Sequence, residues 1–294
     1  MNAPVPSGGD AAHLPSATAP AVFRARGAGK QFGGGRDSAP LRALEPIDLE
    51  VRQGEFVTLI GPSGCGKSTL LRLLAGLAAP SEGELHWWGG GFDAVGATGR
   101  RLVFVFQHPT LMPWARVLAN VRLPLDLAGA ARRAADSAAS RALDQVGLRG
   151  FEGHYPREIS GGMQMRVAIA RALVTAPDLL LMDEPFGALD EITRNKLDAE
   201  LLQWWRAQGL TIVFVTHSIY EAVFLSTRVL VMSARPGRIL REVRIDEPYP
   251  RDNAFRSSPR FAACCRELFA LLGEASSGMQ AEDKQAAGEA AAQA

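Results

Sequence analysis

The stretch Gly61-Pro62-Ser63-Gly64-Cys65-Gly66-Lys67-Ser68 decides the fold, because it fits the pattern G-x-x-x-x-G-K-[ST]. It lies between an apolar run at residues 56–60, which is typical of a buried strand, and an apolar helical pattern that begins at Lys67. In this context the glycines let backbone N–H groups converge on phosphate oxygens, and the helix N-terminus adds its dipole. Lys67 is predicted to reach the terminal phosphates and the Ser68 hydroxyl to ligate Mg²⁺. The alternative is a glycine-rich turn without a ligand.

Apolar, strand-like runs alternate with helical patterns along much of the chain. The run at 179–182 precedes a helix that begins at about Asp190, and the run at 211–216 precedes a helix at 218–225. This alternation predicts an α/β fold with a mostly parallel core sheet that is covered by helices.

Two further patterns add parts to this fold. Short strand-like segments at 22–26, 47–51 and 84–88 predict an antiparallel β-subdomain before and around the first α/β unit. The periodicity from 117 to 173 is helical, which predicts a helical subdomain inserted at about 110–175.

We therefore predict four parts along the chain. Residues 1–20 are a disordered N-terminal segment, 21–245 form the main domain, 246–273 form a C-terminal helical extension, and 274–294 are a disordered tail. The two ends are rich in small and polar residues, which cannot bury enough apolar surface to offset the entropy of ordering.

The composition excludes several classes of protein. The chain has 294 residues, with 32 Lys and Arg against 31 Asp and Glu, so its net charge of +1 creates no field that attracts nucleic acid. Cys65, Cys264 and Cys265 cannot make a disulfide framework for a chain of this size. No run approaches the roughly 18 to 20 apolar residues of a membrane-spanning helix, and the start lacks the features of a secretory signal. We expect a soluble or peripherally attached protein in a reducing compartment, with no nucleic-acid partner.

Polar side chains follow three other predicted strands, at the point where each strand ends. Asp183 and Glu184 come after one strand, Gln107 after another and His217 after a third. Because open α/β sheets bind ligands at the carboxyl ends of their strands, we expect these groups beside the phosphate loop. Asp183 is predicted to hold Mg²⁺ and Glu184 to act as general base toward water. Gln107 and His217 are candidates for the γ-phosphate, and ordinary loop residues are the alternative for all four.

A second glycine-containing helix start follows at Ser160-Gly161-Gly162-Met163-Gln164. By itself this segment is an N-capped helix with a second potential anion site. The alternative is that Ser160 only caps the helix.

At this point the chain resembles the ATP-binding-cassette (ABC) family, and the resemblance covers residues 23 to about 244. The family's motifs occur in the family's order: residues 61–68 look like the Walker A loop, Gln107 like the Q-loop, 160–164 like the signature motif, 179–183 like the Walker B strand, Glu184 like the catalytic glutamate, 188–190 like the D-loop, and His217 like the switch histidine.

The resemblance implies a P-loop NTPase fold, ATP and Mg²⁺ as cofactors, and ATP hydrolysis as the reaction. The implied catalytic residues are Glu184, His217 and Gln107, and the implied metal-binding residues are Ser68, Gln107 and Asp183. The implied nucleotide-binding residues are Phe32, Gly61, Pro62, Ser63, Gly64, Cys65, Gly66, Lys67, Ser68, Thr69, Ser160, Gly161 and Gly162.

Two positions depart from the commonest family pattern. Met163 stands between the signature glycines and Gln164, where the family usually has Gln directly. Phe32 stands where a Tyr often stacks on adenine, and stacking needs only a π-face. An ordinary core residue is the alternative for Phe32. In the family, two cassettes associate head to tail, so that Ser160 to Gly162 of one chain complete the site of the other.

Finer similarity points to importers of nitrate, sulfonates, taurine and related small compounds, including pyrimidine precursors. It rests on residues 111–114, the Ser-Gly-Gly-Met-Gln variant, and residues 216–222 and 232–238. The implied partners are a second ATP-binding subunit, transmembrane permease subunits and, indirectly, a periplasmic or extracellular solute-binding protein. The implied place is the cytoplasmic face of the inner membrane. Met112 and Trp114 either face the permease or pack inside the subdomain.

Two other functions use the same phosphate loop. A non-transport ABC ATPase that remodels nucleic acid or ribosomes usually carries paired cassettes, coiled arms or basic extensions, which this chain lacks. A small-molecule kinase would have no use for the signature segment.

Overall fold

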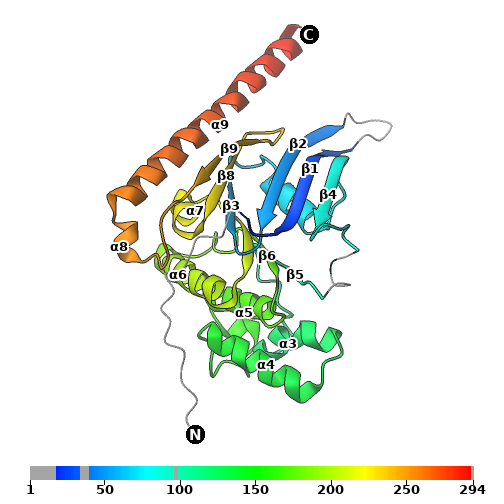
Figure 1. Ribbon diagram of the computed structural model, residues 1–294, viewed down its shortest axis with the longest axis vertical. Helices are drawn as coiled ribbons and strands as arrows, with labels where there is room; N and C mark the ends of the chain where they lie inside the picture. Colours follow the sequence, from blue (N-terminus) through cyan, green and yellow to red (C-terminus); the bar gives the residue numbers. More distant parts are fainter. Residues whose placement is uncertain (1–17, 34–39, 94, 96–98, 293–294) are drawn as a thin grey trace.

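The computed structural model describes residues 18–33, 40–93, 95 and 99–292. Within these residues the chain forms a larger sheet, a smaller sheet beside it, and a layer of helices at one end (Figure 1).

The larger sheet has six strands among the described residues, and its strands are parallel except for the last. In spatial order they are β5 (Leu102–Val105), β6 (Leu179–Asp183), β7 (Thr211–Val215), β3 (Phe56–Ile60), β8 (Arg228–Met232) and the antiparallel β9 (Ile239–Arg244). The smaller sheet is antiparallel, in the order β2 (Leu41–Arg52), β1 (Ala21–Phe32) and β4 (Glu82–Trp87).

The central strands of the larger sheet are buried on both faces, which explains their continuous apolar sequences. Because side chains alternate along a strand, Phe56 and Ile60 join one apolar cluster, while Val57 and Leu59 join the cluster on the other face. Full burial of such side chains stabilises the fold by roughly 1.5–3 kcal/mol each.

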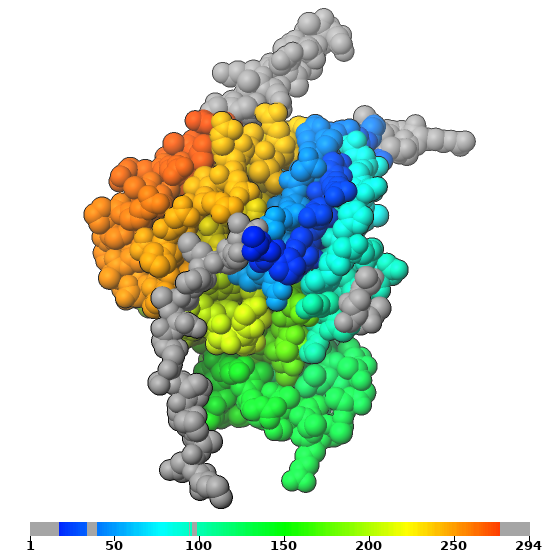
Figure 2. Space-filling model, viewed as in Figure 1, coloured from blue at the N-terminus to red at the C-terminus, as the bar shows by residue number. Residues whose placement is uncertain are grey.

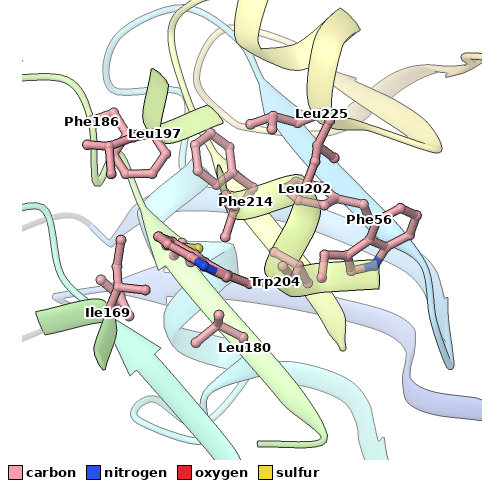
Figure 3. Close-up of a cluster of buried hydrophobic side chains, with 14 of the residues drawn as sticks. Phe56, Ile169, Leu180, Phe186, Leu197, Leu202, Trp204, Phe214 and Leu225 are labelled. Atoms are coloured by element: carbon pink, nitrogen blue, oxygen red, sulfur yellow. The ribbon is translucent and has the colours of Figure 1, made fainter. Parts of the chain in front are cut away.

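Aromatic rings fill the first of these clusters, between the sheet and the helices that cover it (Figure 3). The Phe214 ring lies 6.0 Å from that of Phe56 and 5.9 Å from that of Phe186, measured between centroids. Phe186 follows β6, which ends at Asp183, so this packing anchors the chain directly after Asp183 and Glu184.

A layer of helices lies between β5 and β6 in the sequence and makes the lower lobe in Figure 2. It contains α3 (Val117–Leu127), α4 (Arg132–Gln145), the short η1 (Pro156–Glu158) and α5 (Gly161–Leu173). The buried face of α4 carries alanines at 135, 139 and 142, which have helical spacing. Their small side chains let the neighbouring helices approach closely.

The remaining helices are α1 (Lys67–Leu74), α6 (Glu191–Gln208), α7 (Ile219–Leu225), α8 (Asn253–Arg256) and α9 (Pro259–Ala292). Helix α9 lies along the sheet and then extends away from the body of the protein (Figure 1). Among the described residues, none of the helices combines the length and the apolar character that crossing a membrane requires.

The predicted α/β fold, with its parallel core, antiparallel sheet and inserted helices, is confirmed. The sequence analysis does not predict β8 or β9. It also differs at the C-terminal end, because α9 continues through residues 274–292, where a disordered tail was expected. Alanine is the strongest helix former, so a segment that is too small and polar for a core can still be helical. Residues 1–17 of the predicted N-terminal segment lie outside the described residues.

Candidate functional site

The loop from Gly61 to Ser68 joins the carboxyl end of β3 to the first turn of α1. Gly64 (φ 73°) and Gly66 (φ 103°) both have left-handed backbone conformations that favour glycine. At Gly66 both the backbone conformation and the packing disfavour a side chain, because a Cβ would lie 2.6 Å from the Leu44 side chain. The glycine pattern of the sequence is therefore required by the loop's conformation and its packing.

Lys67 folds back across this loop instead of pointing into solvent. Its Nζ donates hydrogen bonds to the carbonyl oxygens of Gly61, at 2.9 Å, and Pro62, at 3.0 Å, and only 6% of the residue is exposed. A cationic group and the free N–H groups at the start of α1 thus face the same hollow, an arrangement that suits phosphate oxygens.

The Ser68 hydroxyl and the Asp183 carboxylate meet beside the loop. Ser68 Oγ, in the first turn of α1, donates to Oδ1 of Asp183, the last residue of β6, at 3.0 Å. Burial raises the pKa of Asp183, the hydrogen bond from Ser68 lowers it, and the neighbouring Glu184 raises it. A hydroxyl and a carboxylate are hard oxygen donors, and Mg²⁺ is usually held by one or two carboxylates together with substrate phosphates. These residues fit Mg²⁺.

Glu184 and His217 form the next pair along this edge. His217 Nδ1 lies 3.3 Å from Glu184 Oε2, and the carboxylate side chain is 23% exposed. Glu184 has φ 46°, a conformation uncommon outside glycine, and its N–H donates to the Val215 carbonyl at 2.9 Å. Gly187 lies beside the imidazole, since a Cβ there would be 3.4 Å from His217 Cε1, in van der Waals contact.

These groups open into one cavity of about 600 Å³, a size within the usual range for sites that bind small molecules and cofactors. The structure thereby brings together nearly all the site residues that the sequence predicts. The cavity is lined by Phe32, Leu41, Ala43, Gly61, Ser63, Gly64, Cys65, Gly66, Lys67, Ser68, Thr69, Gln107, Asp183, Glu184, His217 and Arg235. Phe32 is 44% exposed, so it is not an ordinary core residue.

The Ser160 to Gly162 segment does not line this cavity. It begins α5, where Ser160 Oγ accepts a hydrogen bond from the Met163 N–H at 3.3 Å, and Ser160 and Gly161 are exposed. Pro62 also lies outside the lining set, although its carbonyl contacts Lys67.

Arg235 also lines the cavity, although no sequence pattern indicates it as a site residue. Its Nε donates to the Gly64 carbonyl at 3.2 Å, and it lines the cavity from the turn between β8 and β9. Gly237, in the same turn, lies so close to the loop that a Cβ would stand 2.0 Å from the Cys65 carbonyl oxygen. No local pattern reveals this contact, because about 170 residues separate Gly64 from the turn.

Comparison with known proteins places this geometry in a family. Residues 44–187 match the family model described as ABC transporter. The chain is 48% identical over 242 residues to an uncharacterized ABC transporter ATP-binding protein of Methanocaldococcus jannaschii, with coverage of 82% of this chain and 87% of the relative.

Two relatives carry more specific names. The aliphatic sulfonates import ATP-binding protein of Bacillus cereus is 43% identical over 231 residues, covering 79% of this chain and 89% of the relative. The taurine import ATP-binding protein of Rhizobium johnstonii is 43% identical over 248 residues, covering 82% and 93%.

A solved structure shows the same architecture. It is a dimeric post-hydrolysis state of an ATP-binding cassette bound to ADP and Pi, at 32% identity and a TM-score of 0.67, and the match covers 76% of this chain and 99% of that one. The resemblance drawn from the motifs is confirmed. The chain belongs to the ABC transporter family, as an ATP-binding subunit that hydrolyses ATP with Mg²⁺.

Proposed function

We propose that this chain is the energy-coupling ATPase of an importer for small sulfonated compounds, such as taurine or aliphatic sulfonates. The observation that carries the proposal is the single cavity that receives the phosphate loop, both acids and His217. The import names of the relatives at 43% identity supply the substrate class.

Nucleotide binding follows from the phosphate loop. The N–H groups at the start of α1 and the Lys67 ammonium hold the phosphates, and Lys67 exchanges its two loop carbonyls for phosphate oxygens. Phe32 offers a half-exposed ring in the wall of the cavity, where it stacks on the adenine.

Bound Mg²⁺ supplies electrostatic stabilisation of the phosphate charge, and Ser68, Asp183 and Gln107 hold it. For the hydrolytic step, Glu184 accepts a proton from the attacking water. His217, 3.3 Å from Glu184, donates a hydrogen bond toward the terminal phosphate as negative charge develops on it.

The Ser160 to Gly162 segment completes the site of a second copy of the chain, since Ser160 and Gly161 are exposed and the segment does not line its own cavity. Its helix start offers a further set of free N–H groups for the terminal phosphate of the partner's nucleotide. Two copies arranged head to tail then enclose two nucleotides.

A permease contacts the surface around Trp114, which is 76% exposed. The buried Asn120 fixes the preceding turn, because its Oδ1 accepts from the Met112 N–H at 2.7 Å and its Nδ2 donates to the Ala115 carbonyl at 3.1 Å. Such a rigid presentation of a large apolar side chain suits a protein interface. The complex lies at the cytoplasmic face of the inner membrane, and a solute-binding protein delivers the substrate from the other side.

The test is transport by the isolated complex. The tagged chain is purified from native membranes with the polytopic membrane protein that accompanies it. The complex is reconstituted in vesicles with the solute-binding protein and labelled taurine outside and ATP inside. We expect ATP-dependent uptake, and we expect the Glu184→Gln complex to show none. Uptake of nitrate or a pyrimidine precursor instead would overturn the substrate class, and co-purification with ribosomes alone would overturn the transport function.

A further inference from the structure

A buried acid holds the loop that carries His217. Glu221, in α7, is 4% exposed, and its Oε2 accepts a hydrogen bond from the Thr216 hydroxyl. The Thr216 Oγ1 in turn accepts from the Ser218 N–H at 2.9 Å. Through these two bonds Glu221 fixes the residues on both sides of His217.

An arginine from a different helix holds the 186–189 loop, which follows Glu184. Arg194, in α6, donates from Nη2 to the Leu189 carbonyl at 2.6 Å and from Nε to the Phe186 carbonyl at 3.3 Å. Its Nε also lies 3.8 Å from Glu221 Oε1. The segment 186–189 begins two residues after Glu184, so one guanidinium joins the loop beside Glu184 to the loop that carries His217.

A second buried ion pair, Asp198 with Arg256, accompanies the pair of Arg194 and Glu221. Asp198, fully buried on α6, pairs with Arg256 of α8 at 2.9 Å, and the Arg256 guanidinium lies 3.6 Å from the centre of the Phe224 ring. Among the described residues, Glu221 Oε1 and Asp198 Oδ1 have no hydrogen-bond partner. Burial raises the pKa of Glu221 to about 7, with a further contribution from Asp198, and burial raises the pKa of Asp198 to about 6.

Stability is a weak reason for such an arrangement. Replacement of a buried ion pair by apolar side chains of similar volume is often neutral or stabilising, because desolvation offsets the attraction between the charges. What the pair does specify is geometry, since its hydrogen bonds end on two backbone carbonyls and one hydroxyl of the two loops.

We propose that Arg194 and Glu221 are positioning residues for ATP hydrolysis, which hold the His217 loop and the 186–189 loop in the arrangement that places His217 against Glu184. The inference rests on the roles of Glu184 and His217 in the proposed function. It predicts a defect in turnover and not in nucleotide binding, because the phosphate loop lies on β3 and α1, away from both residues.

The test compares ATP turnover and the KM for ATP in purified, folded variants. Glu221→Gln can still accept the bond from Thr216 but loses the charge that faces Arg194. Arg194→Lys keeps the charge but cannot reach two carbonyls and a carboxylate together. We expect each variant to lose about tenfold or more in kcat, with the KM changed by less than about twofold.

The matched control is Glu55→Gln. It removes the charge of another buried ion pair, Glu55 with Arg228 at 2.9 Å, next to the amino end of β3 and so at the opposite edge of the sheet. We expect its kcat to stay within about twofold of wild type.

The dependence of kcat on pH distinguishes a positioning role of Glu221 from a purely structural one. The charged groups that face Glu221 are Arg194 and Asp198 from α6 and Arg256 from α8. In the wild type, protonation of Glu221 removes the negative charge that faces Arg194, so kcat should fall as the pH falls through about 7, and Glu221→Gln should lose this part of the profile.

An unchanged kcat in folded Glu221→Gln and Arg194→Lys would overturn the inference, as would an equal loss in Glu55→Gln. Failure of the proposed function looks different, because Glu184→Gln and His217→Ala would then keep wild-type turnover.

Discussion

Two helices of this protein begin at glycine-containing segments and have different surroundings. Helix α1 begins after Gly66, inside a cavity that also holds Lys67, Asp183 and Glu184. Helix α5 begins after the exposed Ser160, which caps its own helix and does not line this cavity. A helix start supplies N–H groups and a dipole, but chemistry needs the cation, the acid and the base as well. This difference supports our proposal that the α1 side supplies one half of a nucleotide site and that the α5 start supplies the other half to a second copy.

The largest expected effect tests the chemistry on the α1 side. Glu184→Gln should still bind ATP but hydrolyse it at least about a hundredfold more slowly, or roughly 3 kcal/mol of barrier, because the general base is lost. The variant should accumulate as an ATP-held dimer. Steady-state turnover and sedimentation with ATP are the measurements, and turnover within a few-fold of wild type would remove Glu184 from its assigned role.

The next effect separates binding from chemistry within the same cavity. Lys67→Ala should weaken ATP binding roughly ten- to hundredfold, the size of one or two charge-assisted hydrogen bonds. His217→Ala is the matched comparison, since it should bind ATP nearly normally and fail in hydrolysis. Nucleotide titration distinguishes the two lesions. Equal loss of binding in both variants would contradict the assignment of His217 to the transition state.

A smaller effect tests the ring of Phe32, which also lines the cavity. Phe32→Ala should weaken ATP binding about fivefold, close to the 1 kcal/mol of a stacked aromatic pair, whereas Phe32→Tyr should keep it. The measurement is a titration with ATP and with inorganic triphosphate. A loss of the same size for triphosphate, which has no base to stack, would argue against adenine stacking.

The smallest effect is the free energy of unfolding that the chain loses when the partly buried Asp183 carboxyl is ionised. Its pKa is raised by burial, so ionisation destabilises the folded chain above the unfolded pKa of about 4 and costs nothing below it. Asp183→Asn, which can still accept from Ser68, should therefore raise the Tm of the nucleotide-free chain slightly at pH 7, and the difference should vanish as the pH falls toward 4. A lower Tm at pH 7 would show that the carboxylate stabilises the empty site.

Sequence reasoning succeeds where one local pattern carries the whole signal. The buried strands and the residues that follow them were predictable, because a five-residue apolar run ends at a defined edge of the sheet. Strand β8 was not, because apolar residues continue from α7 into β8 with only Ser226 and Thr227 between them and no glycine or proline.

Other features depend on packing between distant segments. Arg235 reaches the phosphate loop from the β8–β9 turn, and the contact between Arg194 and Glu221 requires α6 and α7 to lie side by side. Neither contact can be predicted from the hydrophobic periodicity or from the spacing of motifs in the sequence. The role proposed for Ser160 requires a second molecule, and the structure of one chain gives its exposure and its capping hydrogen bond.

The central claim is that Ser160 acts on the nucleotide of another copy, and a mixing experiment tests it most directly. One preparation carries Lys67→Ala and the other Ser160→Arg, so every site in either homodimer has a damaged half. In the mixed dimer, one site contains both lesions, and the other combines an intact Lys67 with an intact Ser160. A Ser160→Asn preparation, which keeps a helix cap, shows how much of the effect is capping alone.

The measurement is ATP-dependent association by sedimentation, for each variant alone and for the mixture. If Ser160 acts across the interface, the mixture associates with ATP while each variant alone does not. If Ser160 serves its own chain, every site in the mixture still carries one lesion, and folded proteins that fail to associate on mixing would contradict the account.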